Sequence, residues 1–132
     1  MLGDQISEET GKVVVIRVLD SAPLKAEVSI HTKGKVLGHD YQGRATYTST
    51  MQAGGFLFGE GHGAYLSMGG DIATWIGHGT GKMKPGGGAS YRGSIHFRTA
   101  TGKLASLAGT VAVFQYETDA NDNTTGKTWE WK

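Results

Sequence analysis

FGEGHGAYLSMGGDIATWIGHGTG (58–81) contains glycine at every second position twice, in GEGHG (59–63) and again in GHGTG (77–81). Alternate residues share one face of a β-strand, whereas a helical face repeats every 3.6 residues. GGD (69–71) lies midway between the two runs and carries the glycines that a tight turn requires. We therefore predict a β-hairpin in which one face of both strands is bare.

The same period of two recurs along most of the chain. LKAEVSIHT (24–32), ASYRGSIHF (89–97) and TWEWK (128–132) alternate apolar with polar residues, and glycine- or asparagine-rich turns separate such runs. We predict an all-β protein of about eight strands at even spacing. Such strands either stack as a sandwich or close on themselves, and the short links favour a single antiparallel meander β-barrel. Residues 1–11 are polar and are expected to form a flexible N-terminal arm, with one barrel domain over 12–132.

The composition excludes several classes of protein. Thirteen basic and twelve acidic residues leave no surplus that suggests nucleic acid as a partner. No apolar run reaches the ~20 residues of a membrane-spanning helix. MLGDQISEETGK (1–12) lacks the basic and apolar regions of a signal peptide, which predicts a soluble, cytoplasmic protein without a membrane partner. The absence of cysteine excludes disulfides and thiolate chemistry.

KVVVIRVL (12–19) is apolar on both faces of a strand. A strand of this kind is normally covered on both sides, here by the barrel interior and by something outside it. The outer cover is either a second subunit or a folded-back terminal arm. We expect the glycine-bearing face, with Tyr65 and Trp75, to point outward as a contact surface. Together these features predict a homo-oligomer, most simply a dimer.

The register of the glycine hairpin predicts a polar cluster inside the barrel. A three-residue turn at GGD would pair Gly61 with Gly79 and His62 with His78. Glu60 would then face Thr80, and the large apolar side chains of the same face would line the interior. A Gly54-Gly55 turn in the preceding hairpin adds further side chains to this cluster. The candidate catalytic residues are Tyr47, Glu60, His62 and His78, and the candidate ligand-binding residues are Ser49, Phe58, Leu66, Ile76, Thr80 and Tyr91.

A carboxylate and imidazoles beside an apolar pocket suit general acid–base chemistry, with Tyr47 as a donor to a developing oxyanion. The alternative is that these polar groups only satisfy one another and bound water at a wide barrel end. No ligand spacing typical of zinc or iron is present, and we expect neither metal nor cofactor. The GxGxG strings lack the following helix that a phosphate site needs.

TATGKLASLAGTVAVFQYETD (99–119) resembles a stretch of calycin-like barrels, including those related to allene oxide cyclase and dirigent proteins. GHGTGKM (77–83), SYRGSIHFRT (90–99) and TWEWK (128–132) look like an uncharacterised bacterial family of one-domain proteins. The resemblance implies a β-barrel, and for the cyclases an apolar substrate held inside it. It carries no functional residue over to this sequence.

Two hypotheses on function follow. The first is a barrel that binds a small apolar molecule, or acts on it as an isomerase or cyclase. The second is a non-catalytic oligomeric module that works through its outer surface. The interior separates the two: a packed barrel with no cavity of about a few hundred cubic ångströms, the lower bound for ligand pockets, contradicts the first hypothesis.

Overall fold

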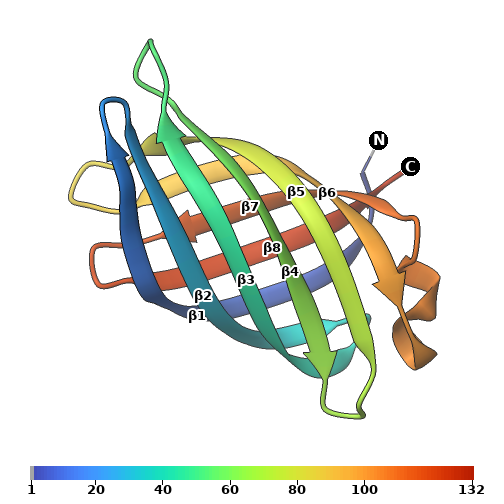
Figure 1. Ribbon diagram of the computed structural model, residues 1–132. Coiled ribbons are helices and arrows are strands. Elements are labelled where there is room, and N and C mark those ends of the chain that lie inside the picture. Colours follow the sequence, from blue (N-terminus) through green and yellow to red (C-terminus); the bar gives the residue numbers. More distant parts are fainter. Residues whose placement is uncertain (1) are drawn as a thin grey trace.

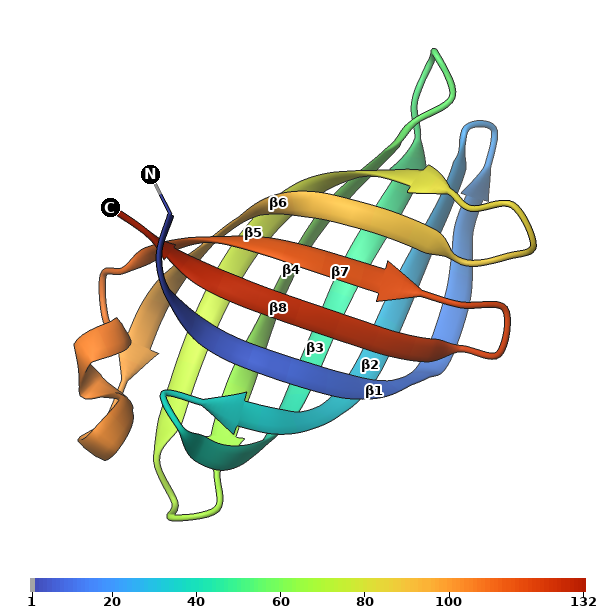
Figure 2. The ribbon, with the colours of Figure 1, turned by 180° about the vertical axis from the view of Figure 1, so that it is seen from behind.

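The chain forms a closed antiparallel β-barrel, described for residues 2–132 by a computed structural model (Figures 1 and 2). The elements are β1 (Leu2–Ser21), β2 (Leu24–Val36), β3 (His39–Met51), β4 (Leu57–Ser67), β5 (Ile72–Met83), β6 (Ala89–Ala100), the 3₁₀ helix η1 (Gly102–Leu107), β7 (Val111–Thr118) and β8 (Asn123–Trp131). Each strand pairs with the next in sequence, and β8 pairs back with β1. The predicted eight-stranded meander barrel is confirmed.

The first strand includes most of the segment that was expected to be a separate arm. Residues from Ser7 to Lys12 pair with β2 on one side and with β8 on the other. Ser7 is buried and Ile6 is only 4% exposed, so this polar segment contributes side chains to the interior. Met1 lies outside the described residues. The alternation in QISEETG (5–11) is the period of a barrel strand, with Ser7 and Glu9 on the inner face.

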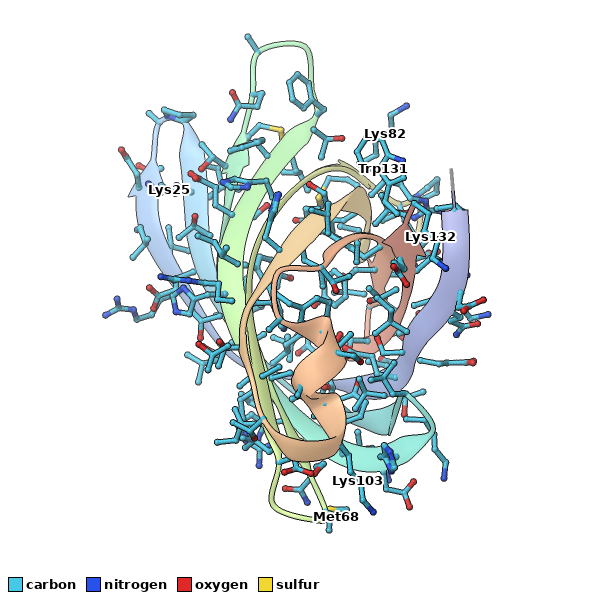
Figure 3. The ribbon with its side chains drawn as sticks, turned by 90° about the vertical axis from the view of Figure 1, so that its right-hand side faces the viewer. Lys25, Met68, Lys82, Lys103, Trp131 and Lys132 are labelled. Atoms are coloured by element: carbon cyan, nitrogen blue, oxygen red, sulfur yellow. The ribbon has the colours of Figure 1, made fainter. Side chains whose placement is uncertain are left out.

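One end of the barrel is closed by η1, which connects β6 to β7 (Figure 3). Leu104 is fully buried and Leu107 is 3% exposed. Both pack into an apolar cluster whose other buried members are Ile6, Val36, Tyr41, Tyr65, Ala73, Ile95, Phe97 and Ala112. The helix therefore seals this end with two leucine side chains.

At the opposite end, β1 and β2 continue beyond the barrel as a hairpin (Figure 1). Pairing of β1 with β8 stops at Lys12, whereas pairing with β2 continues to Ser21. Within residues 2–132, nothing covers the apolar faces that were expected to be buried. The exposed apolar side chains of the hairpin are Val14, Val15, Ile16, Val18, Leu19 and Leu24.

The two central hairpins have registers that differ from the predicted ones. In β4 and β5, Gly61 lies opposite Gly77, and Glu60 lies opposite His78. The turn is centred on Gly69 instead of Gly70, since the backbone N–H of Ser67 donates to the carbonyl oxygen of Asp71. The resulting shift of two positions leaves the faces of this hairpin unchanged. Between β3 and β4, Tyr47 lies opposite Gly61 instead of His62. This shift of a single position exchanges the faces, because side chains alternate along a strand.

The glycines of β4 and β5 consequently line the inside of the barrel. Tyr65 is 4% exposed, and Trp75 packs against the buried cluster, so the outer glycine–aromatic surface predicted from sequence does not exist. A Cβ atom added at Gly63 would lie 2.6 Å from the Trp75 ring. The bare stripe therefore makes room for aromatic rings inside the barrel.

Each of the five tyrosines of the sequence lies directly opposite a glycine on a neighbouring strand. The pairs are Tyr41–Gly34, Tyr47–Gly61, Tyr65–Gly43, Tyr91–Gly81 and Tyr116–Gly126. A narrow barrel cannot hold large side chains on every inward position, so a ring on one strand requires a small residue beside it. Glycine also allows the strong bending that closes a small barrel.

Candidate functional site

A mainly apolar cavity of about 110 Å³ lies within the barrel. A single water molecule needs about 10–15 Å³ of such a cavity, so the space exceeds that of several waters. It is smaller than the few hundred cubic ångströms, roughly the lower bound for ligand pockets, that the first hypothesis on function required. Leu104 and Leu107 belong to the apolar cluster at one end, and a smaller cluster of Leu57, Ala89 and Tyr91 forms the other. The inward-facing residues of the lining are Glu9, Ile30, Thr32, Gly43, Ala45, Tyr47, Gly59, Gly61, Tyr65, Trp75, Gly77, Gly79, Tyr91, Ile95, Phe114, Tyr116, Gly126 and Thr128.

Tyrosine rings form most of the aromatic wall. The ring of Tyr47 packs edge-on against Tyr91 and Tyr116, with centroids 5.9 and 5.6 Å apart. The hydroxyl groups of Tyr47 and Tyr116 are hydrogen-bonded at 3.2 Å, and Tyr91 is bonded to Ser49 at 2.7 Å. Each hydroxyl has a partner, as buried phenols usually require. The rings are therefore held in place and present their faces and edges to the cavity.

Glu9 brings a carboxyl group into this aromatic interior. It lies on β1 opposite Gly34 of β2 and Gly126 of β8. Its Oε1 atom accepts a 2.6 Å hydrogen bond from the hydroxyl of Tyr41. Among residues 2–132, no lysine, arginine or histidine forms an ion pair with it. A partly buried carboxyl without a cationic partner is unusual in a folded protein.

Burial raises the pKa of Glu9 above its ordinary value of 4.5, although hydrogen bonds from Tyr41 and Thr32 oppose this effect. Desolvation disfavours the charged carboxylate, which is why the shift is upward. Burial also raises the pKa of Tyr41, Tyr65 and Tyr116, so these phenols stay neutral near neutral pH. Glu9 is thus the carboxyl group of this cavity, and its burial disfavours the charged form.

Three of the residues predicted from sequence do face the interior. Tyr47 and Tyr91 line the cavity, and Ser49 supports Tyr91 through the hydrogen bond described above. Their positions follow from the alternation along β3 and β6, which places Tyr47 and Ser49 on one face and Thr46, Thr48 and Thr50 on the other. The structure thus brings together the aromatic part of the predicted site.

The predicted polar cluster lies on the outer face of the barrel. Nε2 of His78 is 3.7 Å from Oε2 of Glu60, and the two side chains are 51% and 58% exposed. His62 and Thr80 are also exposed on this outer face. His62 lies opposite Ile76 and not His78. The predicted inward position of these side chains was therefore wrong, because the β3–β4 register differs by one position.

The apolar residues of the same face are likewise outside. Leu66 is 37% exposed and Ile76 is 39% exposed. Phe58 is half-buried by stacking on the ring of His78, with centroids 6.2 Å apart. These side chains were predicted to form the inner wall, but the tyrosines of β3, β6 and β7 already fill that space. The inner faces of β4 and β5 beside these tyrosines carry glycines instead.

Sequence reasoning missed Glu9, Tyr65 and Tyr116 as members of the site. Glu9 stands in a segment that was expected to be an arm, and Tyr65 was placed outside. One signal was present in the sequence: Tyr116 and Tyr91 lie in alternating runs that also hold Phe114 and Ile95. The partners of these rings are glycines on other strands, and this pairing needs the register.

No group of three or more His, Asp or Glu side chains within residues 2–132 is arranged to hold a metal ion. The described chain also has no helix long and apolar enough to cross a membrane.

The sequence matches no protein-family model, and no curated protein is significantly similar to it. Three crystal structures have a similar fold. A conserved protein of unknown function from Rhodopseudomonas palustris is 11% identical, with a TM-score of 0.79 over 98% of this chain and 97% of the other. A protein with unknown function from Clostridium acetobutylicum is 12% identical, with a TM-score of 0.80 over 98% of each chain.

A beta-barrel like protein from Acinetobacter baumannii is 11% identical, with a TM-score of 0.79 over 100% of this chain and 96% of the other. At this level of identity the likeness concerns the fold alone. The chain is an eight-stranded β-barrel that shares its fold, over nearly its whole length, with these three proteins.

Proposed function

We propose that the barrel binds a small, largely apolar molecule in the cavity between its two apolar clusters. The observation that carries this proposal is the aromatic cavity itself, in which hydrogen-bonded tyrosines surround an unfilled space beside Glu9. A concave apolar site with a few fixed polar groups is the usual form of a ligand pocket. A protein whose barrel served only as a scaffold would gain stability by filling this space.

Glu9 gives the same site a group that can donate or accept a proton. Isomerisation or cyclisation of a bound molecule by acid–base help is therefore the chemistry within its reach. Kinship with barrels related to allene oxide cyclase belongs to this proposal and rests on the resemblance of residues 99–119.

Native mass spectrometry of protein purified from its host tests the binding proposal, because a retained ligand adds a defined mass to the 14.0 kDa chain. Gly59→Leu is the matching variant. Gly59 lines the cavity, and a Cβ atom there would lie 3.5 Å from the nearest atom, Cε1 of Tyr91. The leucine side chain should fill the cavity and remove the added mass, whereas Gly59→Ala should keep it. A folded wild-type protein with no added mass, and no affinity for any small apolar probe, contradicts the proposal.

The exposed β1–β2 hairpin supports a second candidate function, self-association. Residues 14–21 of β1 have β2 on one side and, among the described residues, no strand on the other. Ile16 is 56% exposed and Val18 is 66% exposed on this free edge. Unpaired apolar edges pair readily with another strand, and a second copy of the same hairpin offers a matching one. We propose that two copies associate through this hairpin.

Sedimentation velocity of the wild type and two lysine variants tests this association. Ile16→Lys should convert a dimer into a monomer, because a charge would be buried at the centre of the paired edge. Met68→Lys is the control, since Met68 is 70% exposed at the opposite end of the barrel. A wild-type monomer at micromolar concentration contradicts the proposal.

A further inference from the structure

The cavity has one acidic group and aromatic walls. The hydroxyl of Tyr41 donates a hydrogen bond to Oε1 of Glu9. The other carboxylate oxygen, Oε2, lies beside Gly126. A Cβ atom added at Gly126 would be 3.1 Å from Cγ of Glu9. Glycine at this position therefore leaves space for the carboxyl group of Glu9.

The basic residues near this part of the barrel do not share the interior with Glu9. Arg44, His78 and Lys127 contribute to the same stretch of wall, but their side chains are exposed on the outside. Nζ of Lys127 lies 4.0 Å from Oε1 of Glu8, the outward neighbour of Glu9. The charge of Glu9 thus has no counterpart among the described residues.

The aromatic wall of the cavity can bind the cationic group of a ligand as well as its apolar part. The face of a tyrosine ring attracts a cation, most strongly where water is excluded. Tyr65 and Tyr116 are close enough to Glu9 for its charge to affect their titration, so the rings and the carboxyl group act on the same space. A cation beside Glu9 would lie in a cavity that both rings also line.

We propose that the cavity selects an organic cation, namely a small protonated amine whose ammonium group pairs with Glu9 and whose apolar body lies among the tyrosine rings. This inference rests on the proposed binding function and adds the chemical class of the ligand. An ammonium group supplies N–H donors to the carboxylate, and hydrogen bonds between two ionised groups are stronger than those between neutral ones.

The proposal requires a particular dependence on pH. A cation binds the ionised form of Glu9, whose pKa burial has raised, so affinity should increase as pH rises through that pKa. The groups that face Glu9 from the other strands are Tyr41, Tyr65 and Tyr116, with Thr32 and Gly126 beside them. The phenols remain neutral over this range, and the last two carry no charge.

Calorimetric titration with benzylamine and with benzyl alcohol separates charge from shape, because the two probes differ little in size. Three proteins are compared: the wild type, Glu9→Gln and Glu8→Gln. Glu9→Gln keeps the shape of the side chain and an acceptor for Tyr41. Glu8→Gln removes the neighbouring carboxylate, which is 63% exposed on the outer face. Thermal melts of all three show that the variants fold.

Wild type and Glu8→Gln should bind benzylamine at least about tenfold more tightly than benzyl alcohol, a difference of roughly 1.4 kcal/mol. Glu9→Gln should lose this preference and the rise of benzylamine affinity with pH. Equal binding of the two probes by the wild type, or an unchanged preference in Glu9→Gln, overturns the choice of a cation and leaves the binding function in place. If neither probe binds, the cation proposal also fails, and the mass measurement on protein from its host decides the binding function separately.

Discussion

Tyr41 donates a hydrogen bond of 2.6 Å to Glu9 and so connects β3 with β1 across the interior of the barrel, although these strands are not neighbours in the sheet. The bond needs an acceptor on Glu9, which both the carboxylate and the neutral acid provide. The charge of Glu9 is therefore dispensable for this connection. Its presence inside the barrel has to be explained by something other than stability.

Glu9→Gln should stabilise the protein near neutral pH. The folded-state pKa of Glu9 is raised, so the folded protein binds this proton more tightly than the unfolded chain, whose value is near 4.5. The stability that this proton contributes is present below the unfolded pKa and is lost as pH rises through the folded pKa. The variant avoids that loss and should gain about 1 kcal/mol at pH 7, the usual scale of single substitutions. Urea unfolding at pH 4 and pH 7 checks it, and a gain that is equal at both values contradicts the explanation.

Gly93→Ala and Gly59→Ala should have opposite outcomes, although both glycines point into the barrel. A Cβ atom at Gly93 would overlap the carbonyl oxygen of His78, whereas at Gly59 it would meet Tyr91 at an ordinary 3.5 Å. We expect Gly93→Ala to lose about 1–3 kcal/mol of unfolding free energy through overpacking. Gly59→Ala should be neutral or gain about 0.4–1 kcal/mol, because the unfolded chain loses freedom. Chemical denaturation measures both, and equal losses would show that the inner face of β4 is packed more tightly than described.

His62→Ala and His78→Ala should leave both the fold and the binding of probes unchanged. Both side chains are on the outer face, and His78 is 51% exposed beside Glu60. Exposed pairs of this kind contribute little, and surface substitutions usually stay within about 0.5 kcal/mol. Thermal midpoints and benzylamine titrations test this. Loss of binding in either variant would show that the histidine takes part in the site and would contradict the outward placement of this face.

Leu104→Ala should destabilise the barrel by opening the end that η1 closes. Leu104 is fully buried in the apolar cluster, and removing a leucine side chain from such a site costs about 2–5 kcal/mol. Lys103→Ala is the matched control on the same helix, because Lys103 is exposed (Figure 3). Comparison of the two thermal midpoints measures how much the packing of η1 contributes to stability. Similar midpoints would mean that the barrel is stable without it.

The sequence predicted the architecture but not which face of the central strands is inside. Alternation in LKAEVSIHT (24–32) and ASYRGSIHF (89–97), with regular turns between such runs, was enough for the eight-stranded meander. The two faces of GEGHG (59–63) were assigned by the assumption that larger side chains point inward. The structure shows the opposite assignment: the glycines face the interior, beside the aromatic rings that point inward from β3, β6 and β7.

Turn length explains the rest of the error. A two-residue turn at Gly54-Gly55 would have placed Tyr47 opposite His62, but the actual pairing of Met51 with Leu57 places it opposite Gly61. A single residue in one turn thus moved Glu60 and both histidines from the inside to the outside. The buried position of Glu9 could not be predicted from the residues around it in the sequence. The residues that surround it lie on β2, β3 and β8, which are distant in the sequence.

The pairing of every tyrosine with a glycine has a consequence for how this cavity can change. If the tyrosine and the glycine of one pair were exchanged, the summed side-chain volume of the pair would stay the same. The empty space beside the glycine would then lie on the other strand of the pair. The five pairs are spread over all strands but one of the barrel, since β1 alone holds no member. The barrel can therefore be reshaped around a different guest molecule by reciprocal exchanges within pairs, while β1 and its carboxyl group stay in place.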